Sequence, residues 1–480
     1  MFSHQDEWAV PEPVRTFVNA LYRAVSDSSL IAIADLYAIQ YFKVTERFFK
    51  ASPWPAAELV ADLVNHDELF LILYKELHYR HLCNNRDCTP SVQDRIDAFN
   101  NFLALFNMLL DQSESNPKLQ LPSLWLWDIV HEFVLQKFAF DELVSGVDRG
   151  ELQELNDEPG AWSLPTVLQY LHALVEKGRV PLKLNPEVTA ADSGDKGVGI
   201  SGSFRSLSYY SLISLALVHC RIGDYQAALE TLEPIDQRKR SHIAKIYTCY
   251  STLQFVSGFS SLMLHKFMDA IRILSGLFSY AVNSKSLATH RAHEISQGFI
   301  QQTPLHEQAL ALITIVVAVC PNARIDDSVM SAIKEEYGDE LAEMENGAPE
   351  VVRRLFEFGM PPLFSESGAQ NDLRTFRTSL FLKEVALRQS AAGLDAFLKL
   401  YATIPISKLA TSLNLQRSEL IQQLMAHKAL GPDSGSDLQF VIQDDIVRVT
   451  YSKPPRRHLD FFTRNIQKLN EMAREVERIS

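Results

Sequence analysis

Residues 407–450, SKLATSLNLQRSELIQQLMAHKALGPDSGSDLQFVIQDDIVRVT, decide the fold of the C-terminal part of this chain. The segment opens with a short helical pattern at 407–412, and a longer one follows at 417–430. The few residues between the two patterns are typical of a helix-turn-helix unit. A further helix is expected just upstream, at 395–402.

The end of the same segment predicts a β-hairpin. Apolar and polar residues alternate at 439–443 and again at 446–450, which is the period of a half-buried strand. The pair Asp444-Asp445 separates the two runs and suits a two-residue turn. Three helices followed by a hairpin predict a winged helix.

Stacked helices are expected upstream of the winged helix. The segment Gly223–Leu229 can be laid over His265–Ile271 at an offset of 270 − 228 = 42 residues, so that Tyr225 pairs with Phe267. Small residues recur at the same offset, which lets antiparallel helices approach closely. This weak repeat is typical of tetratricopeptide-like helical hairpins.

We therefore expect a mainly α protein in which a helical-repeat solenoid is followed by a winged-helix subdomain and a long C-terminal helix. A stretch rich in Gly, Ser and Asp interrupts the helical patterns after the first third of the chain. The expected parts are an N-terminal helical region (1–182), a flexible linker (183–206), helical repeats (207–393), the winged helix (394–451) and the C-terminal helix (452–480).

The C-terminal helix carries apolar residues in heptad-like steps, a seam that a lone helix cannot bury. These residues are Phe462, Ile466, Leu469, Ala473 and Val476. Just before them lie Lys453, Arg456 and Arg457. A solvated helix face and turn are the simpler interpretation of these basic residues, and contact with RNA phosphate is the alternative.

Composition narrows the function classes. Gly and Pro make up 19 + 21 = 40 of 480 residues, fewer than the roughly 12% of average proteins, which favours helices. The charge sum of 46 − 59 = −13 disfavours a polyanion as the main partner. Five scattered cysteines indicate a reducing compartment, and the first ten residues do not resemble a signal peptide. The longest apolar run, Ala309–Cys320, is too short to span a membrane and predicts a buried helix.

No motif predicts an active site. Gly197–Gly202 matches G-x-G-x-x-G, but no strand pattern precedes it, so we interpret it as a loop. His78, His81, Cys83 and Cys88 lack the second ligand cluster that a structural zinc site needs. Neither an HExxH, a G-x-S-x-G nor a Walker motif occurs. The chain is expected to be no enzyme and to hold no cofactor or metal.

A helical array that ends in a winged helix and a tail helix resembles the PCI-domain family. Several strings narrow the resemblance to the subunit L family of eukaryotic translation initiation factor 3. They are VTERFFKASPWP (44–55), LFLILYKELHYRHL (69–82), LPSLWLWDI (121–129), RIDDSVMSAIKEEYGD (324–339), AFLKLYATIPISKLATSL (396–413) and RRHLDFFTRNIQKL (456–469). The resemblance runs in order from about residue 10 to the C-terminus.

This resemblance implies a non-catalytic, cytoplasmic scaffold that supports assembly of the factor on the small ribosomal subunit and recruitment of mRNA. It implies subunits K and E as neighbours, reached through the winged helix and the C-terminal helix, with no membrane. Because an open sheet edge invites pairing with another chain, we expect interaction residues on the hairpin and on the tail. They are Phe440, Ile442, Val447, Val449, Phe462, Ile466, Leu469 and Val476.

Two alternatives remain open. A PCI scaffold of the proteasome lid or the signalosome would use the same fold in another assembly. A winged-helix DNA-binding regulator would read duplex DNA through the helix at 417–430, which offers Arg417, Gln422, Gln423 and Lys428 together with His427. The acidic balance of the chain disfavours the regulator.

Overall fold

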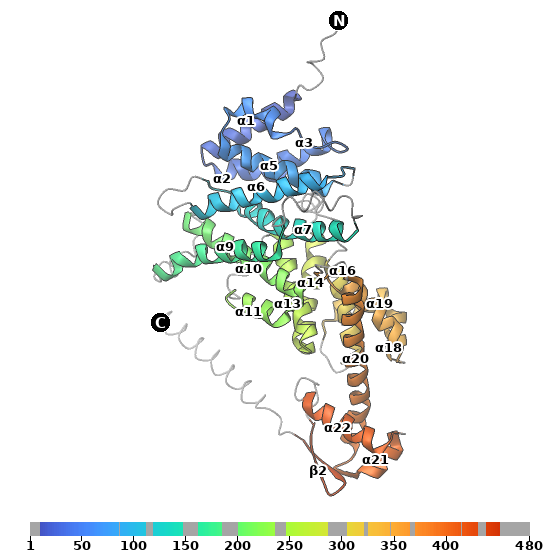
Figure 1. Cartoon of the computed structure of the whole chain (residues 1–480). Coiled ribbons are helices and arrows are strands. Elements are labelled where there is room, and N and C mark those ends of the chain that lie inside the picture. The colour runs from blue at the N-terminus through green and yellow to red at the C-terminus, as the bar shows by residue number, and fades with distance from the viewer. Residues whose placement is uncertain are drawn as a thin grey trace, which may run out of the picture.

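The structure is a computed structural model of the 480-residue chain. It describes residues 10–85, 87–111, 119–146, 162–184, 200–235, 246–286, 305–320, 325–345, 347–364, 370–413, 415–430 and 438–451. Helices stack along most of the molecule, and one small sheet lies at the far end of the last long helix (Figure 1). The predicted mainly α fold, with helical repeats followed by a winged helix, is confirmed. Among the described residues, no helix is both long and apolar enough to cross a membrane.

The N-terminal region packs around buried aromatic side chains. Trp54, Trp125 and Trp162 are almost fully buried, and Trp125 stacks on Tyr37 with ring centroids 4.8 Å apart. The region comprises α1 (Glu12–Ser26), α2 (Leu30–Asp35), the π-helical turn η1 (Leu36–Gln40), α3 (Tyr41–Phe48), α4 (Ala57–Val60), the 3-10 turn η2 (Ala61–Val64), α5 (Glu68–Asn84), α6 (Val92–Asp111), α7 (Ser123–Gly146) and α9 (Leu164–Leu184).

Helical hairpins follow, as the 42-residue offset predicts. α10 pairs with α11, and α13 pairs with α14 in the same way. Gly258 explains the close approach in the second hairpin, since a Cβ there would stand 2.5 Å from Leu274 Cδ2. The helices are α10 (Ile200–Ile222), α11 (Tyr225–Leu232), α13 (Tyr247–Met263), α14 (Phe267–Ser286), α16 (Leu305–Val319), α17 (Asp327–Glu336), α18 (Gly338–Glu345) and α19 (Pro349–Gly359).

The linker expected at 183–206 is too wide. Helix α9 continues to Leu184 and α10 begins at Ile200, because Phe204 and Leu207 already supply buried residues at helical spacing. The end of the G-x-G-x-x-G match, from Ile200 to Gly202, is therefore helical. The rest of the match lies outside the described residues.

Helix α20 (Gln370–Leu400) is a single helix of 31 residues. The sequence predicted a new element at 394 and a short helix at 395–402, and that prediction is wrong. Phe381 packs into the stacked helices, whereas Leu394, 394 − 381 = 13 residues later, packs into the winged helix. Two side chains thirteen residues apart on a helix point in directions about 140° apart. The buried face therefore changes along α20, and the apolar pattern looks interrupted.

The winged helix contains the helices predicted at 407–412 and 417–430 and the predicted hairpin, together with the end of α20 and a short strand that the sequence pattern did not reveal. Its elements are β1 (Thr403–Pro405), α21 (Ile406–Leu413), α22 (Arg417–Leu430), β2 (Leu438–Gln443) and β3 (Ile446–Tyr451). The strands form an antiparallel sheet in the order β1-β3-β2. Asp444 (φ 50°) and Asp445 (φ 65°) both adopt left-handed conformations, as a tight two-residue hairpin turn requires.

Candidate protein-interaction surfaces

Strand β2 is an edge strand whose outer backbone groups can be identified from the register. The Val449 N–H donates to the Ala402 carbonyl at 2.9 Å, so the backbone groups of Val449 face β1. Successive residues of an antiparallel ladder face opposite neighbours. Thr450 and Arg448 therefore face β2, where Gln439 and Val441 oppose them. The alternate residues of β2 direct their backbone groups away from β3, toward the outer edge of the sheet. They are Leu438, Phe440 and Ile442, and no strand of the described residues pairs with them at that edge.

The four hairpin residues expected to contact a partner lie together, but their side chains face inward. Phe440, Val447 and Val449 are buried in the core of the winged helix, and Ile442 packs against that core. Phe440 and Ile442 can thus reach a partner through their backbone only. Val447 and Val449 direct their backbone groups toward β1 and not toward the open edge of β2. Their contact with a partner stays a prediction. Val441, which was not among the predicted interaction residues, is 53% exposed on the outer face of β2.

The tail residues expected to interact all lie outside the described residues. They are Phe462, Ile466, Leu469 and Val476 of the heptad-like seam, and the basic residues Lys453, Arg456 and Arg457. Their roles stay predictions.

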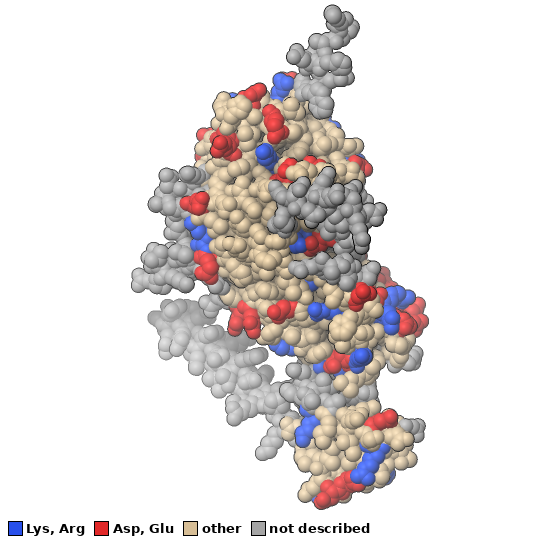
Figure 2. All heavy atoms as spheres, in the orientation of Figure 1, with Lys and Arg blue, Asp and Glu red and all other residues tan. Residues whose placement is uncertain are grey.

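Helix α22, the candidate DNA-reading helix, offers little positive surface. Arg417 at the start of α22 forms an ion pair with Asp445 in the hairpin turn, and Lys428 lies near the other end of the helix. His427 is 4% exposed, with its ring 5.7 Å from that of Phe440, so it is part of the core. On the face drawn in Figure 2, Lys and Arg side chains are scattered among Asp and Glu. This arrangement disfavours duplex DNA as a partner.

Helix α20 exposes an apolar stripe that the sequence analysis missed. Leucines recur every seven residues at positions 373, 380, 387 and 394. Leu394 is buried in the winged helix, but Leu373, Leu380 and Leu387 are partly exposed, and Phe376 between them is 59% exposed. The heptad spacing was the signal for this stripe, and it was hidden because the helix was not predicted in one piece.

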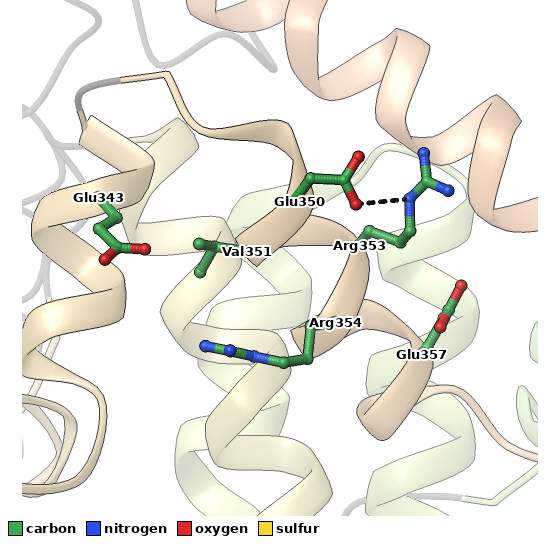
Figure 3. Close-up of a pocket in the computed structure, with 6 residues that line it drawn as sticks. All are labelled: Glu343, Glu350, Val351, Arg353, Arg354 and Glu357. Atoms are coloured by element: carbon green, nitrogen blue, oxygen red, sulfur yellow. Dashed lines mark ion pairs between the residues drawn. The ribbon is translucent and has the colours of Figure 1, made fainter.

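A shallow pocket between α18 and α19 is lined mainly by charged residues (Figure 3). Arg353 Nε lies 3.4 Å from Glu350 Oε2, and Arg354 forms an ion pair at 3.1 Å with Glu340 on α18. These pairs are solvent-exposed, and their charges largely compensate each other.

A buried charged cluster joins α5, α7 and η1. Arg80 forms an ion pair with Glu76, and its Nη1 lies 3.7 Å from Asp128 Oδ2. The Tyr37 hydroxyl donates to the same Asp128 oxygen at 2.5 Å, and the Trp125 indole donates to Glu76 at 2.9 Å. Burial raises the pKa of Asp128 to about 7, although Arg80 opposes the shift.

The buried cluster is closed to solvent, so it fits a structural role rather than a substrate site. The nearby histidines give no sign of ligand chemistry either. Burial lowers the pKa of His81 to about 4, and no cluster of potential metal ligands is found in the described part of the chain.

Comparison with known proteins identifies the family. Residues 94–469 match the family model described as RNA polymerase I-associated factor PAF67. The chain is 31% identical over 532 aligned positions to eukaryotic translation initiation factor 3 subunit L of Mus musculus, with 100% of the chain and 92% of the relative covered. The subunit L of Nematostella vectensis is 30% identical, with 98% and 93% covered. The subunit L of Homo sapiens is also 30% identical, with 100% and 92% covered. This chain, with its stacked helices and terminal winged helix, therefore belongs to the family of eukaryotic translation initiation factor 3 subunit L.

Proposed function

We propose that this chain is a non-catalytic scaffold subunit of the eukaryotic translation initiation factor 3 complex. In this role it supports assembly of the factor on the small ribosomal subunit in the cytoplasm and contributes to mRNA recruitment. The observation that carries the proposal is the open edge of β2, at the end of α20, in a chain related over its whole length to subunit L.

The partners of the proposal are other subunits of the factor, with K and E as the immediate neighbours. The docking mode is strand addition, in which an incoming strand pairs with the N–H and C=O groups of Phe440 and Ile442. Their inward-facing side chains, buried at Phe440 and partly buried at Ile442, hold β2 in register, while the exposed Val441 contacts the partner on the outer face. Main-chain pairing gives affinity, and the shape around Val441 gives specificity.

A matched pair of variants at Ile442 tests the docking mode. Both Ile442→Pro and Ile442→Ala lose the packing of the side chain, but only proline also lacks the N–H that faces the open edge. Each tagged variant is expressed in cells, purified gently and sedimented against small ribosomal subunits. We expect the alanine variant to retain the other subunits and the small-subunit peak, and the proline variant to lose both.

Equal partner capture by the two variants contradicts pairing through this edge. The partners recovered with the unaltered chain test the assembly itself. Recovery of proteasome-lid or signalosome subunits would support a scaffold role in one of those complexes instead. Recovery of the chain alone, with tight and salt-sensitive binding to duplex DNA, would favour the DNA-binding regulator.

The tail supplies a second contact in the proposal. Phe462→Asp combined with Leu469→Asp places two charges in the heptad-like seam, and is expected to release the chain from its assembly without unfolding it. Unchanged co-sedimentation with the other subunits would exclude this seam from the interface. Charge reversal at Lys453, Arg456 and Arg457 tests RNA contact separately, through crosslinking to RNA.

A further inference from the structure

The 42-residue repeat extends to the hydrogen bonds that end its helices. After α10, Gly223 has φ +97° and the Asp224 N–H donates to the His219 carbonyl at 2.9 Å. After α13, His265 has φ +63° and the Lys266 N–H donates to the Ser261 carbonyl, also at 2.9 Å. Each of these positions in the second turn lies 42 residues after its counterpart, since 265 − 223 = 42 and 266 − 224 = 42. The two turns are structurally equivalent.

The first of these turns receives an arginine from α20. Arg377 Nη1 donates to the Tyr225 hydroxyl at 2.8 Å, and Nη2 donates to the Ile222 carbonyl at 3.4 Å. The guanidinium carbon lies 5.2 Å from the centre of the Tyr225 ring. A side chain at Gly223 would collide with this arginine, because a Cβ there would stand 1.8 Å from Arg377 Nη2.

The second turn receives another arginine in the same manner. Arg388 is 6% exposed, and its guanidinium carbon lies 4.1 Å from the centre of the Phe267 ring. Arg388 Nη2 donates to the His265 carbonyl at 3.4 Å. Phe267 is the counterpart of Tyr225, since 267 − 225 = 42. Glu384, one turn earlier on α20, holds Arg388 Nε at 3.1 Å.

Both arginines therefore occupy the same kind of site on consecutive hairpins. The carbonyls at a helix C-terminus carry partial negative charge and favour a cation, and the aromatic face adds a cation–π contact. The arginines are 388 − 377 = 11 residues apart, about three helical turns or ~16 Å along α20. One helix can thus engage two stacked hairpins from the same side.

The winged helix begins shortly beyond the second arginine. Leu394 of its core comes six residues after Arg388, and Gly393 lies between them in the uninterrupted helix. Glycine is the weakest helix former after proline. We propose that Arg377 and Arg388 form a two-point clamp that fixes the direction of α20 against the repeats, and so positions the winged helix, with Gly393 as the point of bending. The clamp concerns geometry within the chain and does not depend on the proposed function.

Distance measurements between the two regions test the clamp. Spin labels are introduced as unnatural amino acids at Arg272 on α14 and Lys408 on α21, which are both exposed. The full chain with both arginines should give a narrow distance distribution by pulsed electron paramagnetic resonance. Combined Arg377→Ala and Arg388→Ala should broaden it, and lysine at both positions should restore it in part because only the charge returns. Arg353→Ala, an exposed arginine outside the clamp, is the matched control and should leave it narrow.

Two further readouts separate the clamp from loss of folding. Amide exchange in α13 and α14 should be unchanged in the double alanine variant. That result would show that the hairpin of α13 and α14 remains folded. Gly393→Ala should narrow the distribution in the chain that keeps both arginines. An unchanged distribution in the double alanine variant, or broadening equal to that of Arg353→Ala, overturns the clamp. A distribution that Gly393→Ala fails to narrow overturns the bending point.

Discussion

The stacked helices and the winged helix have separate cores, although α20 contributes to both. The core of the stacked helices includes tryptophans at 54, 125, 127 and 162 and continues from α1 to α20. The core of the winged helix holds eleven buried apolar residues, of which Phe440 is the one aromatic among those described. Leu394 and Leu398 of α20 are two of the eleven. The core of the winged helix therefore includes the C-terminal part of α20, and the earlier part of the same helix packs into the stacked helices.

This difference in size predicts a difference in stability. A small core leaves little surplus over the conformational entropy that folding removes, whereas a long continuous core buries a larger fraction of its surface. We expect the winged helix to open locally before the stacked helices unfold. That order suits a region proposed to bind a partner through an open strand edge.

The largest expected loss of stability comes from a substitution in the larger core. Trp125→Ala removes a fully buried ring and leaves Glu76 without its indole donor. We expect the free energy of unfolding to fall by about 3–5 kcal/mol, because a cavity remains and one carboxylate oxygen of Glu76 loses its donor. Urea unfolding followed by circular dichroism measures the change. The exposed Leu59→Ala is the control, and its effect should stay within about 0.5 kcal/mol.

The next effect should stay within the winged helix. Leu398→Ala truncates a fully buried side chain, and we expect a local loss of about 2–5 kcal/mol. Hydrogen exchange should show lost protection in β3 and α22 and unchanged protection in α13. Leu400→Ala, two residues on and 75% exposed, should leave both regions unchanged. Loss of protection in α13 would show that the two cores unfold as one unit.

The third effect concerns how the free energy of unfolding of the larger core varies with pH. The pKa of Asp128 is raised from its ordinary value of 3.8 to about 7 in the folded chain. The folded state therefore keeps a proton that the unfolded state releases, so this contribution is complete below the unfolded pKa and is lost as the pH rises through 7.

Asp128→Asn keeps an acceptor for Tyr37 but cannot ionise. Its free energy of unfolding should thus fall less steeply between pH 4 and 7 than that of the unaltered chain. Thermal melts across this range measure the slope, and the surface variant Asp269→Asn is the control. A slope that Asp128→Asn leaves unchanged would assign the pH dependence to other groups.

Local signals in the sequence were sufficient to predict the winged helix, but not to predict how α20 joins it to the stacked helices. The hairpin follows from alternation around Asp444-Asp445, because turn geometry is set by neighbouring residues. Strand β1 was missed because three residues ending in Pro405 gain their order from pairing with β3. Helix α20 was divided in two because its halves bury different faces. The burial of the Phe440 and Val449 side chains could not be predicted, because a pattern gives alternation but not which face of the hairpin is covered.

The two equivalent turns show how a repeat can persist after its residues diverge. Gly223 and His265 adopt the same left-handed conformation, but the first has no side chain and the second has an imidazole. Arg377 reaches so close to Gly223 that even alanine would displace it. Substitution is therefore disfavoured at Gly223, where φ is +97° and Arg377 would have to move, whereas the second copy already carries a side chain. A mutational tolerance map of this chain should be asymmetric between the two halves of its repeat. Equivalent main-chain hydrogen bonds would then still indicate a duplicated hairpin after sequence identity between the two copies has been lost.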